Sequence, residues 1–154
     1  MGVAATVRSK LLEPDVQTAY GGSGPFVITC DHASNSMPTE FASLGLSGAD
    51  LLRHIAWDPG ALGVSRAMSQ RLNAPVVAGR VSRLLVDCNR PLDAPDLIAE
   101  VSERTIVQGN ANLTPKQRLE RIERFYDPFH EALDRAVTGK IKQASTTPLL
   151  ATLN

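Results

Sequence analysis

The sequence predicts an α/β fold in which helices flank a mainly parallel or mixed sheet. Short apolar runs typical of buried strands alternate with segments whose apolar residues recur every three or four positions. The order along the chain is strand, polar loop, helix, strand, long loop, helix, strand, and such alternation is typical of parallel sheets. With 154 residues and 43% hydrophobic content, the chain is long enough for one domain with a single core.

The first core strand is expected just after Pro25, over residues 27–30, because β-forming residues follow a stretch rich in glycine. Residues 1–24 show no clear periodicity. We therefore expect them to form an extended lead-in, and the domain to span residues 25–154.

Asp31, His32 and Asn35 follow this strand directly. Open α/β sheets bind their ligands at the carboxyl ends of their strands, so this position favours a functional site. His32 is therefore a candidate metal ligand. The alternative is a structural histidine that only forms hydrogen bonds.

A short helix is predicted between Ser47 and Pro59, because Ser47 and Asp50 have the spacing of a capping box. Asp58 then lies at the exit of this helix, where Gly60 allows the backbone to bend sharply. A carboxylate presented from such a turn can bind a metal beside an imidazole. The alternative is that Asp58 caps the helix that follows.

The middle of the chain predicts one further helix and two short strands. The helix is expected over residues 61–72, and the strands over residues 76–78 and 84–86. Residues 91–113 are irregular, and so long a loop in one domain is usually functional or mobile.

The last part of the chain predicts a long helix and a final strand. Thr114 and Gln117 form a second capping box, and Pro128 should kink the helix near Arg124. Residues 148–153 are expected to form a buried strand.

Arginines gather near the predicted strand at residues 84–86. Arg83 and Arg90 need anionic partners if they are buried, and a guanidinium binds a carboxylate through two parallel hydrogen bonds. A substrate that carries a carboxylate is one interpretation. The other pairs both arginines with acids nearby, namely Asp87, Asp93 and Asp96.

His54 precedes Asp58 by four residues, so the two share one face if the helix persists. It could then orient Asp58 as a hydrogen-bond partner.

Composition limits the classes of partner. Sixteen basic residues balance sixteen acidic ones, which argues against nucleic acid or an anionic membrane and favours a small metabolite. No apolar run is long enough to span a bilayer, so we expect a soluble, cytoplasmic protein. Cys30 and Cys88 are expected to be buried free thiols.

Four stretches occur in a recognisable order: CDHASN (30–35), HIAWDPGA (54–61), SRLLVDCNRP (82–91) and YDPFH (126–130). Together they resemble the N-formylglutamate amidohydrolase (deformylase) family, which is related to zinc carboxypeptidases. The resemblance implies a zinc-carboxypeptidase-like, phosphorylase/hydrolase-like fold. It also implies a zinc ion, or another divalent metal, that activates water to attack an amide carbonyl.

The resemblance further implies the substrate and its reaction. N-formyl-L-glutamate, or a related N-acyl amino acid with a carboxylate, would be cleaved to formate and the amino acid, as in histidine degradation.

Roles for individual residues follow from the same resemblance. His32 matches the first zinc histidine, and Asp58 is the candidate carboxylate ligand, since Asn35 stands where zinc carboxypeptidases have a glutamate. The candidate substrate-binding residues are Asn35, Arg83, Asn89 and Arg90. His54 and His130 are candidates for orienting the ligands or for alternative ligation.

The chain also departs from the family. Members are longer and place a second histidine after the final strand, with a general-base glutamate later still, so these are expected beyond Asn154. Residues 25–154 are therefore expected to be the N-terminal part of the domain, truncated at its C-terminus. Two alternatives stay open: a non-catalytic module that binds carboxylates, and a homo-oligomer in which another copy covers the edge strand.

Overall fold

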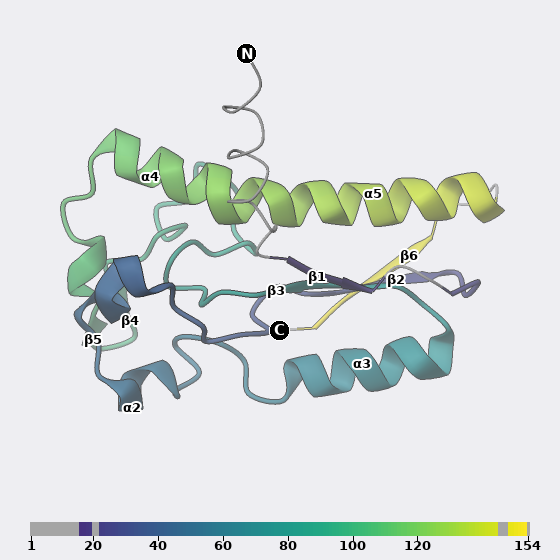
Figure 1. Ribbon diagram of the computed structural model, residues 1–154, viewed down its shortest axis with the longest axis horizontal. Coiled ribbons are helices and arrows are strands. Elements are labelled where there is room, and N and C mark those ends of the chain that lie inside the picture. The colour runs from purple at the N-terminus through teal and green to yellow at the C-terminus, as the bar shows by residue number, and fades with distance from the viewer. Residues whose placement is uncertain (1–15, 20–21, 145–147, 154) are drawn as a thin grey trace, which may run out of the picture.

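A four-stranded sheet lies between two layers of helices in the computed structural model (Figure 1), which describes residues 16–19, 22–144 and 148–153. Three neighbouring strands are parallel and the fourth is antiparallel, which confirms the predicted α/β class with a mixed sheet. In their order across the sheet the strands are β1 (Val16–Ala19), β3 (Val76–Gly79), β2 (Phe26–Cys30) and β6 (Leu149–Thr152).

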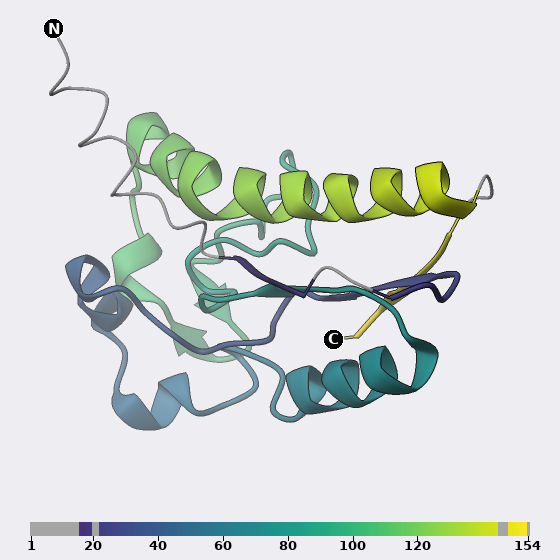
Figure 2. The same cartoon turned by 45° about the vertical axis from the view of Figure 1, so that its right-hand side comes forward.

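One helix covers one face of the sheet and a longer helical segment covers the other (Figures 1 and 2). On the first face lies α3 (Ala61–Leu72), whose bounds are those predicted from the sequence. The helix begins at Gly60, which has a φ of 94°, and it ends at the left-handed Asn73. The sharp bend expected at Gly60 is thus confirmed.

The segment on the other face consists of α4 (Pro115–Arg121), the π-helical turn η3 (Ile122–Tyr126) and α5 (Asp127–Ala144). The predicted capping box of Thr114 and Gln117 is present. Pro128 lacks an N–H, so it cannot continue the α-helical ladder to Arg124. The expected irregularity therefore takes the form of the π-helical turn.

The central strand β2 is buried on both faces, as a near-continuous apolar strand of a parallel sheet should be. Val27 packs into the cluster under α5 with Phe125 and Phe129, while Ile28 packs into the cluster under α3 with Ala78. Cys30 and Cys88 are buried and free, as predicted. Among the described residues, no helix is long and apolar enough to cross a membrane.

The predicted strand at residues 84–86 is wrong, because these residues form a buried turn. Side chains, rather than a neighbouring strand, satisfy their backbone carbonyls. Asn110 donates to the carbonyl of Leu84, and Arg121 donates to the carbonyl of Leu85. The side of β3 on which such a strand could pair is already occupied by β1.

The predicted helix between Ser47 and Pro59 is shorter than expected. Its capping box forms, but α2 (Gly48–Leu51) has only four residues. The chain then continues in turns. The carbonyl of Ala56 accepts hydrogen bonds from the Ser82 hydroxyl and from the Arg83 backbone N–H, so it is used in tertiary contacts instead of a helical ladder.

The final predicted strand forms as β6, but it is not buried. Within the part of the chain that the structure describes, it pairs with β2 alone, and Leu149 and Leu150 are both more than half exposed.

Other elements lie outside the predicted pattern. Residues 1–15 and 20–21 of the expected lead-in lie outside the described residues, whereas Val16–Ala19 pairs with β3. A small hairpin, β4 (Val101–Ser102) and β5 (Thr105–Ile106), interrupts the long loop. Two 3-10 segments, η1 (Thr39–Gly45) and η2 (Gln108–Asn110), contact each other.

Candidate metal and substrate site

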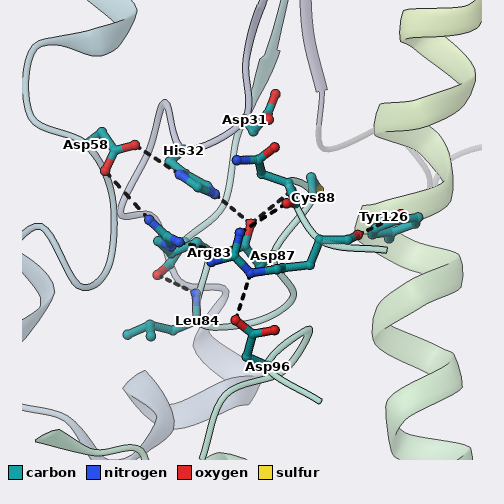
Figure 3. A network of polar contacts seen from close by, with 12 residues as sticks. Asp31, His32, Asp58, Arg83, Leu84, Asp87, Cys88, Asp96 and Tyr126 are labelled. Atoms are coloured by element: carbon teal, nitrogen blue, oxygen red, sulfur yellow. Dashed lines mark hydrogen bonds and ion pairs between the residues drawn. The ribbon is translucent and has the colours of Figure 1, made fainter. Parts of the chain in front are cut away.

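His32 lies just beyond the carboxyl end of β2, with its ring between two carboxylates (Figure 3). Nδ1 is 3.0 Å from Oδ2 of Asp58, and Nε2 is 2.6 Å from Oδ1 of Asp87. The side chain is almost fully buried. Carboxylates accept hydrogen bonds, so the ring satisfies both partners only when both of its nitrogens donate.

Arg83 completes this cluster by contacting both acids. One guanidinium nitrogen donates to Asp87 over 2.8 Å, and the other lies 3.8 Å from Asp58. One arginine and one histidine thus face two carboxylates.

Backbone hydrogen bonds hold the two acids in place. The N–H of Asp58 donates to the carbonyl of His32 over 3.0 Å, so the turn before α3 is tied directly to the end of β2. The N–H of Asn89 donates to Asp87 over 2.9 Å. Burial favours the neutral form of Asp87, but the hydrogen bond and charge of His32, together with Arg83, leave its pKa below the ordinary value.

The pKa of Asp31 is shifted in the opposite direction, above its ordinary value. Its carboxyl is buried beside the site and accepts a hydrogen bond from the Thr29 hydroxyl over 2.7 Å. Burial raises its pKa more than this hydrogen bond and the nearby His32 lower it. Two neighbouring aspartates therefore differ, with Asp87 favoured as the anion and Asp31 shifted toward the neutral acid.

A pocket of about 220 Å³ opens next to the cluster. Asp87 and Arg83 line it, so one side of the histidine cluster faces this space. The remaining lining residues are Leu84, Arg90, Asp96, Ala99, Val101, Ser102 and Glu103.

The donors around His32 fit a metal ion only in part. Nδ1 of His32 and Oδ2 of Asp58 are close enough for one cation to replace the proton between them. Asp87 would then keep the N–H on Nε2, an arrangement typical of metal-bound histidines. Asp87 lies on the other side of the ring from Asp58, and among the described residues no group of three or more such ligands could hold an ion.

Three of the four predicted substrate-binding residues have side-chain partners within the protein. Asn35 donates to the carbonyl of Leu51 over 2.9 Å and so ties the site loop to α2. Arg90 donates to Asp96 over 2.8 Å, while Arg83 pairs with Asp87, so both arginines have the acidic partners of the alternative interpretation. Asn89 is exposed and contributes its backbone N–H to Asp87.

The two remaining histidines lie away from the Asp58 carboxylate contact. His54 is exposed, and its Nε2 is 2.7 Å from Oε1 of Glu103, so its position does not support a role in orienting Asp58. His54 and Asp58 would share one face only on a continuous helix, and α2 ends before His54. His130 stacks on Tyr126 and donates to the carbonyl of Cys88, which supports the turn that carries Asp87.

Asp87 is the residue whose role the sequence did not indicate. The sequence indicates it only as an ion-pair partner of arginine, whereas in the structure it also contacts His32. Its position directly after an apolar run was the available signal, because Asp31 and His32 follow β2 in the same manner.

The comparisons with known proteins point to one family. The family model of N-formylglutamate amidohydrolase matches residues 24–152. A solved gene product from Agrobacterium tumefaciens shares 33% sequence identity with a TM-score of 0.87, over 96% of this chain and 60% of that one. An N-formylglutamate amidohydrolase from Ralstonia eutropha JMP134 shares 22% identity with a TM-score of 0.61, over 88% of this chain and 55% of that one.

The second structure supports the fold alone, and the chain spans only part of the length of both proteins. No curated protein matches the chain.

Proposed function

The chain belongs to the N-formylglutamate amidohydrolase family, and we propose that it carries part of the active site of a metal-dependent hydrolase. Its substrate would be N-formyl-L-glutamate or a related N-acyl amino acid, cleaved to formate and the free amino acid. The observation that carries the proposal is the placement of His32 between Asp58 and Asp87 at the carboxyl edge of the sheet.

His32 and Asp58 are the proposed ligands of zinc or another divalent ion. Such an ion, when bound, lowers the pKa of a coordinated water and polarises an amide carbonyl. Asp87 holds the His32 ring through Nε2 and keeps Nδ1 directed at Asp58. A catalytic zinc site normally has three protein ligands, so a further ligand must come from outside the described residues.

The pocket beside this cluster is the proposed substrate site. Arg90 is partly exposed, and its partner Asp96 is more than half exposed, so a substrate carboxylate can compete for this guanidinium at modest cost. Arg83 is held by Asp87 and lies near Asp58, so its role is to fix the acids as well as to add positive charge.

Formate release from N-formyl-L-glutamate, measured with and without added Zn²⁺, tests this function. We expect release that depends on the metal and falls at least about a hundredfold in His32→Ala, which loses a proposed ligand. Glu131→Ala is the control, since Glu131 is exposed on α5 and pairs with Arg135. Absence of metal binding together with unchanged behaviour of His32→Ala would overturn the proposal.

A second candidate function follows from the incomplete ligand set among the described residues. It is a module that binds carboxylates without turnover. Calorimetric binding of N-formyl-L-glutamate that is lost in Arg90→Ala, with no formate released at any zinc concentration, would favour this module over the hydrolase.

A further inference from the structure

The hairpin of β4 and β5 forms one wall of the pocket. Val101, Ser102 and Glu103 line that wall, and Arg83 and Arg90 also line the pocket. The contacts that fix the position of this hairpin therefore also determine the shape of the pocket next to Arg83 and Arg90.

Glu103, at the tip of the hairpin, binds the turn that follows α2. Its Oε1 accepts from Nε2 of His54 over 2.7 Å, and its Oε2 accepts from Arg53 over 3.2 Å. Arg53 also donates to the Thr105 hydroxyl over 2.9 Å and to Asp50 over 3.3 Å. Two adjacent residues of one turn thus hold both ends of the hairpin loop.

The backbone conformation at Glu103 gives independent evidence that the carboxylate of this residue is needed to hold the hairpin. Ser102 and Thr105 are paired, so Glu103 and Arg104 form a two-residue turn, and Glu103 has a φ of 55°. Glycine, asparagine and aspartate favour such positions, whereas a longer side chain there is unfavourable. The glutamate is a poor choice for the turn itself, but it supplies the carboxylate that Arg53 and His54 bind.

The segment after α2, which binds Glu103, is itself hydrogen-bonded to residues around His32. Asn35, three residues after His32, donates to the carbonyl of Leu51 at the end of α2. The carbonyl of Ala56, in the turn after Arg53 and His54, accepts from the backbone N–H of Arg83. The segment that receives Glu103 is thus tied to both the site loop and the arginine.

We propose that Glu103 is a positioning residue that clamps the hairpin onto the segment after α2 and thereby fixes the pocket wall for a carboxylate ligand. This inference rests on the proposed function, since it assigns the pocket to the N-acyl amino acid. The three side chains are exposed, so the clamp depends on several contacts that act together rather than on one strong pair.

Glu103→Asn tests the clamp, because asparagine suits a left-handed turn but is too short to reproduce both contacts. We expect an unchanged or higher Tm, faster amide hydrogen exchange over residues 101–106, and binding of N-formyl-L-glutamate weakened by about threefold to tenfold. A residue with a merely structural role would instead lower Tm. Glu131→Gln is the matched control, because it removes an exposed glutamate ion pair on α5.

The exchanged pair Arg53→Glu with Glu103→Arg provides a second test. It restores one attraction with reversed polarity but loses the contacts of Arg53 with Asp50 and Thr105 and of Glu103 with His54, so exchange rates and affinity should recover only part of the way from the values of either single change. Unchanged exchange in Glu103→Asn, or faster exchange with unchanged affinity, would overturn the positioning role. If the wild type binds no N-acyl amino acid, the proposed function and the ligand role fail together, while exchange still decides whether Glu103 holds the hairpin.

Discussion

At the scale of single residues, the site depends on one imidazole that is hydrogen-bonded to two carboxylates. His32 contacts Asp58 through one nitrogen and Asp87 through the other, and Arg83 reaches both acids. Removal of either acid would leave a buried histidine nitrogen without its partner, which costs about 1–3 kcal/mol. The cluster is therefore a unit whose members should not be expected to act additively.

Asp31 gives a prediction on pH dependence. Burial raises the pKa of its carboxyl in the folded state, so ionisation at neutral pH destabilises the fold, and the penalty disappears below the ordinary pKa of aspartate. Asp31→Asn removes this penalty and can still accept the hydrogen bond from Thr29. We expect the Tm of the variant to exceed that of the wild type at about pH 7, and the difference to vanish near pH 3.5.

Thermal unfolding of both proteins across this pH range is the measurement. The same experiment on Asp134→Asn, an exposed aspartate of α5, controls for the loss of one negative charge. A wild type that is more stable than Asp31→Asn at neutral pH would show that the site uses the charge of Asp31.

At the scale of elements, buried polar side chains shape the turn that carries Asp87. Arg121 is buried at the end of α4 and donates to the carbonyls of Leu85 and Gly109 and to the side chain of Asn110. Asn110 in turn donates to the carbonyls of Leu84 and Ala99. These contacts replace the strand pairing that an apolar run would otherwise need.

Arg121→Met should therefore destabilise the protein strongly. The change keeps most of the apolar stem but leaves two carbonyls and one amide oxygen without a donor, which we expect to cost about 2–4 kcal/mol. Chemical denaturation measures this as a fall in the free energy of unfolding. Arg118→Met, on the same helix and partly exposed, should cost much less, and equal effects of the two changes would contradict this account of the turn.

The elements that the sequence predicted correctly are those with local causes. The capping box at Thr114, the bend at Gly60 before α3 and the buried run of β2 are each encoded within a few residues. The turn at residues 84–86 was not predictable in this way, because its donors come from residues more than twenty positions away. His32 and Asp58 could be chosen as candidates because the residues next to each of them indicate a site. The contact of His32 with Asp87 joins distant parts of the chain, so no local pattern predicts it.

At the scale of the whole molecule, both broad faces of the sheet carry helices (Figure 2), and the sheet ends in the edge strands β1 and β6. Among the described residues β6 pairs with β2 alone, and its Leu149 and Leu150 side chains are exposed. Exposed apolar edge strands favour association with other chains. We propose self-association of this chain through β6.

Light scattering at increasing protein concentration tests this association. We expect the mean mass of the wild type to rise with concentration, and Leu150→Lys to suppress the rise, because a charge on an edge strand opposes pairing. Leu92→Lys is the control, since Leu92 is similarly exposed but lies outside the sheet. A constant monomer mass for the wild type would contradict the proposal.

Calorimetric titration with Zn²⁺ tests whether His32 and Asp58 bind a metal while Asp87 orients the ring. We expect one zinc ion per chain, no measurable binding for His32→Ala, and an affinity that is about 10-fold to 100-fold lower for Asp87→Asn. Asp58→Asn should weaken binding further than Asp87→Asn, because it removes a ligand. The absence of zinc binding in the wild type, or equal binding by the wild type and His32→Ala, would contradict the claim.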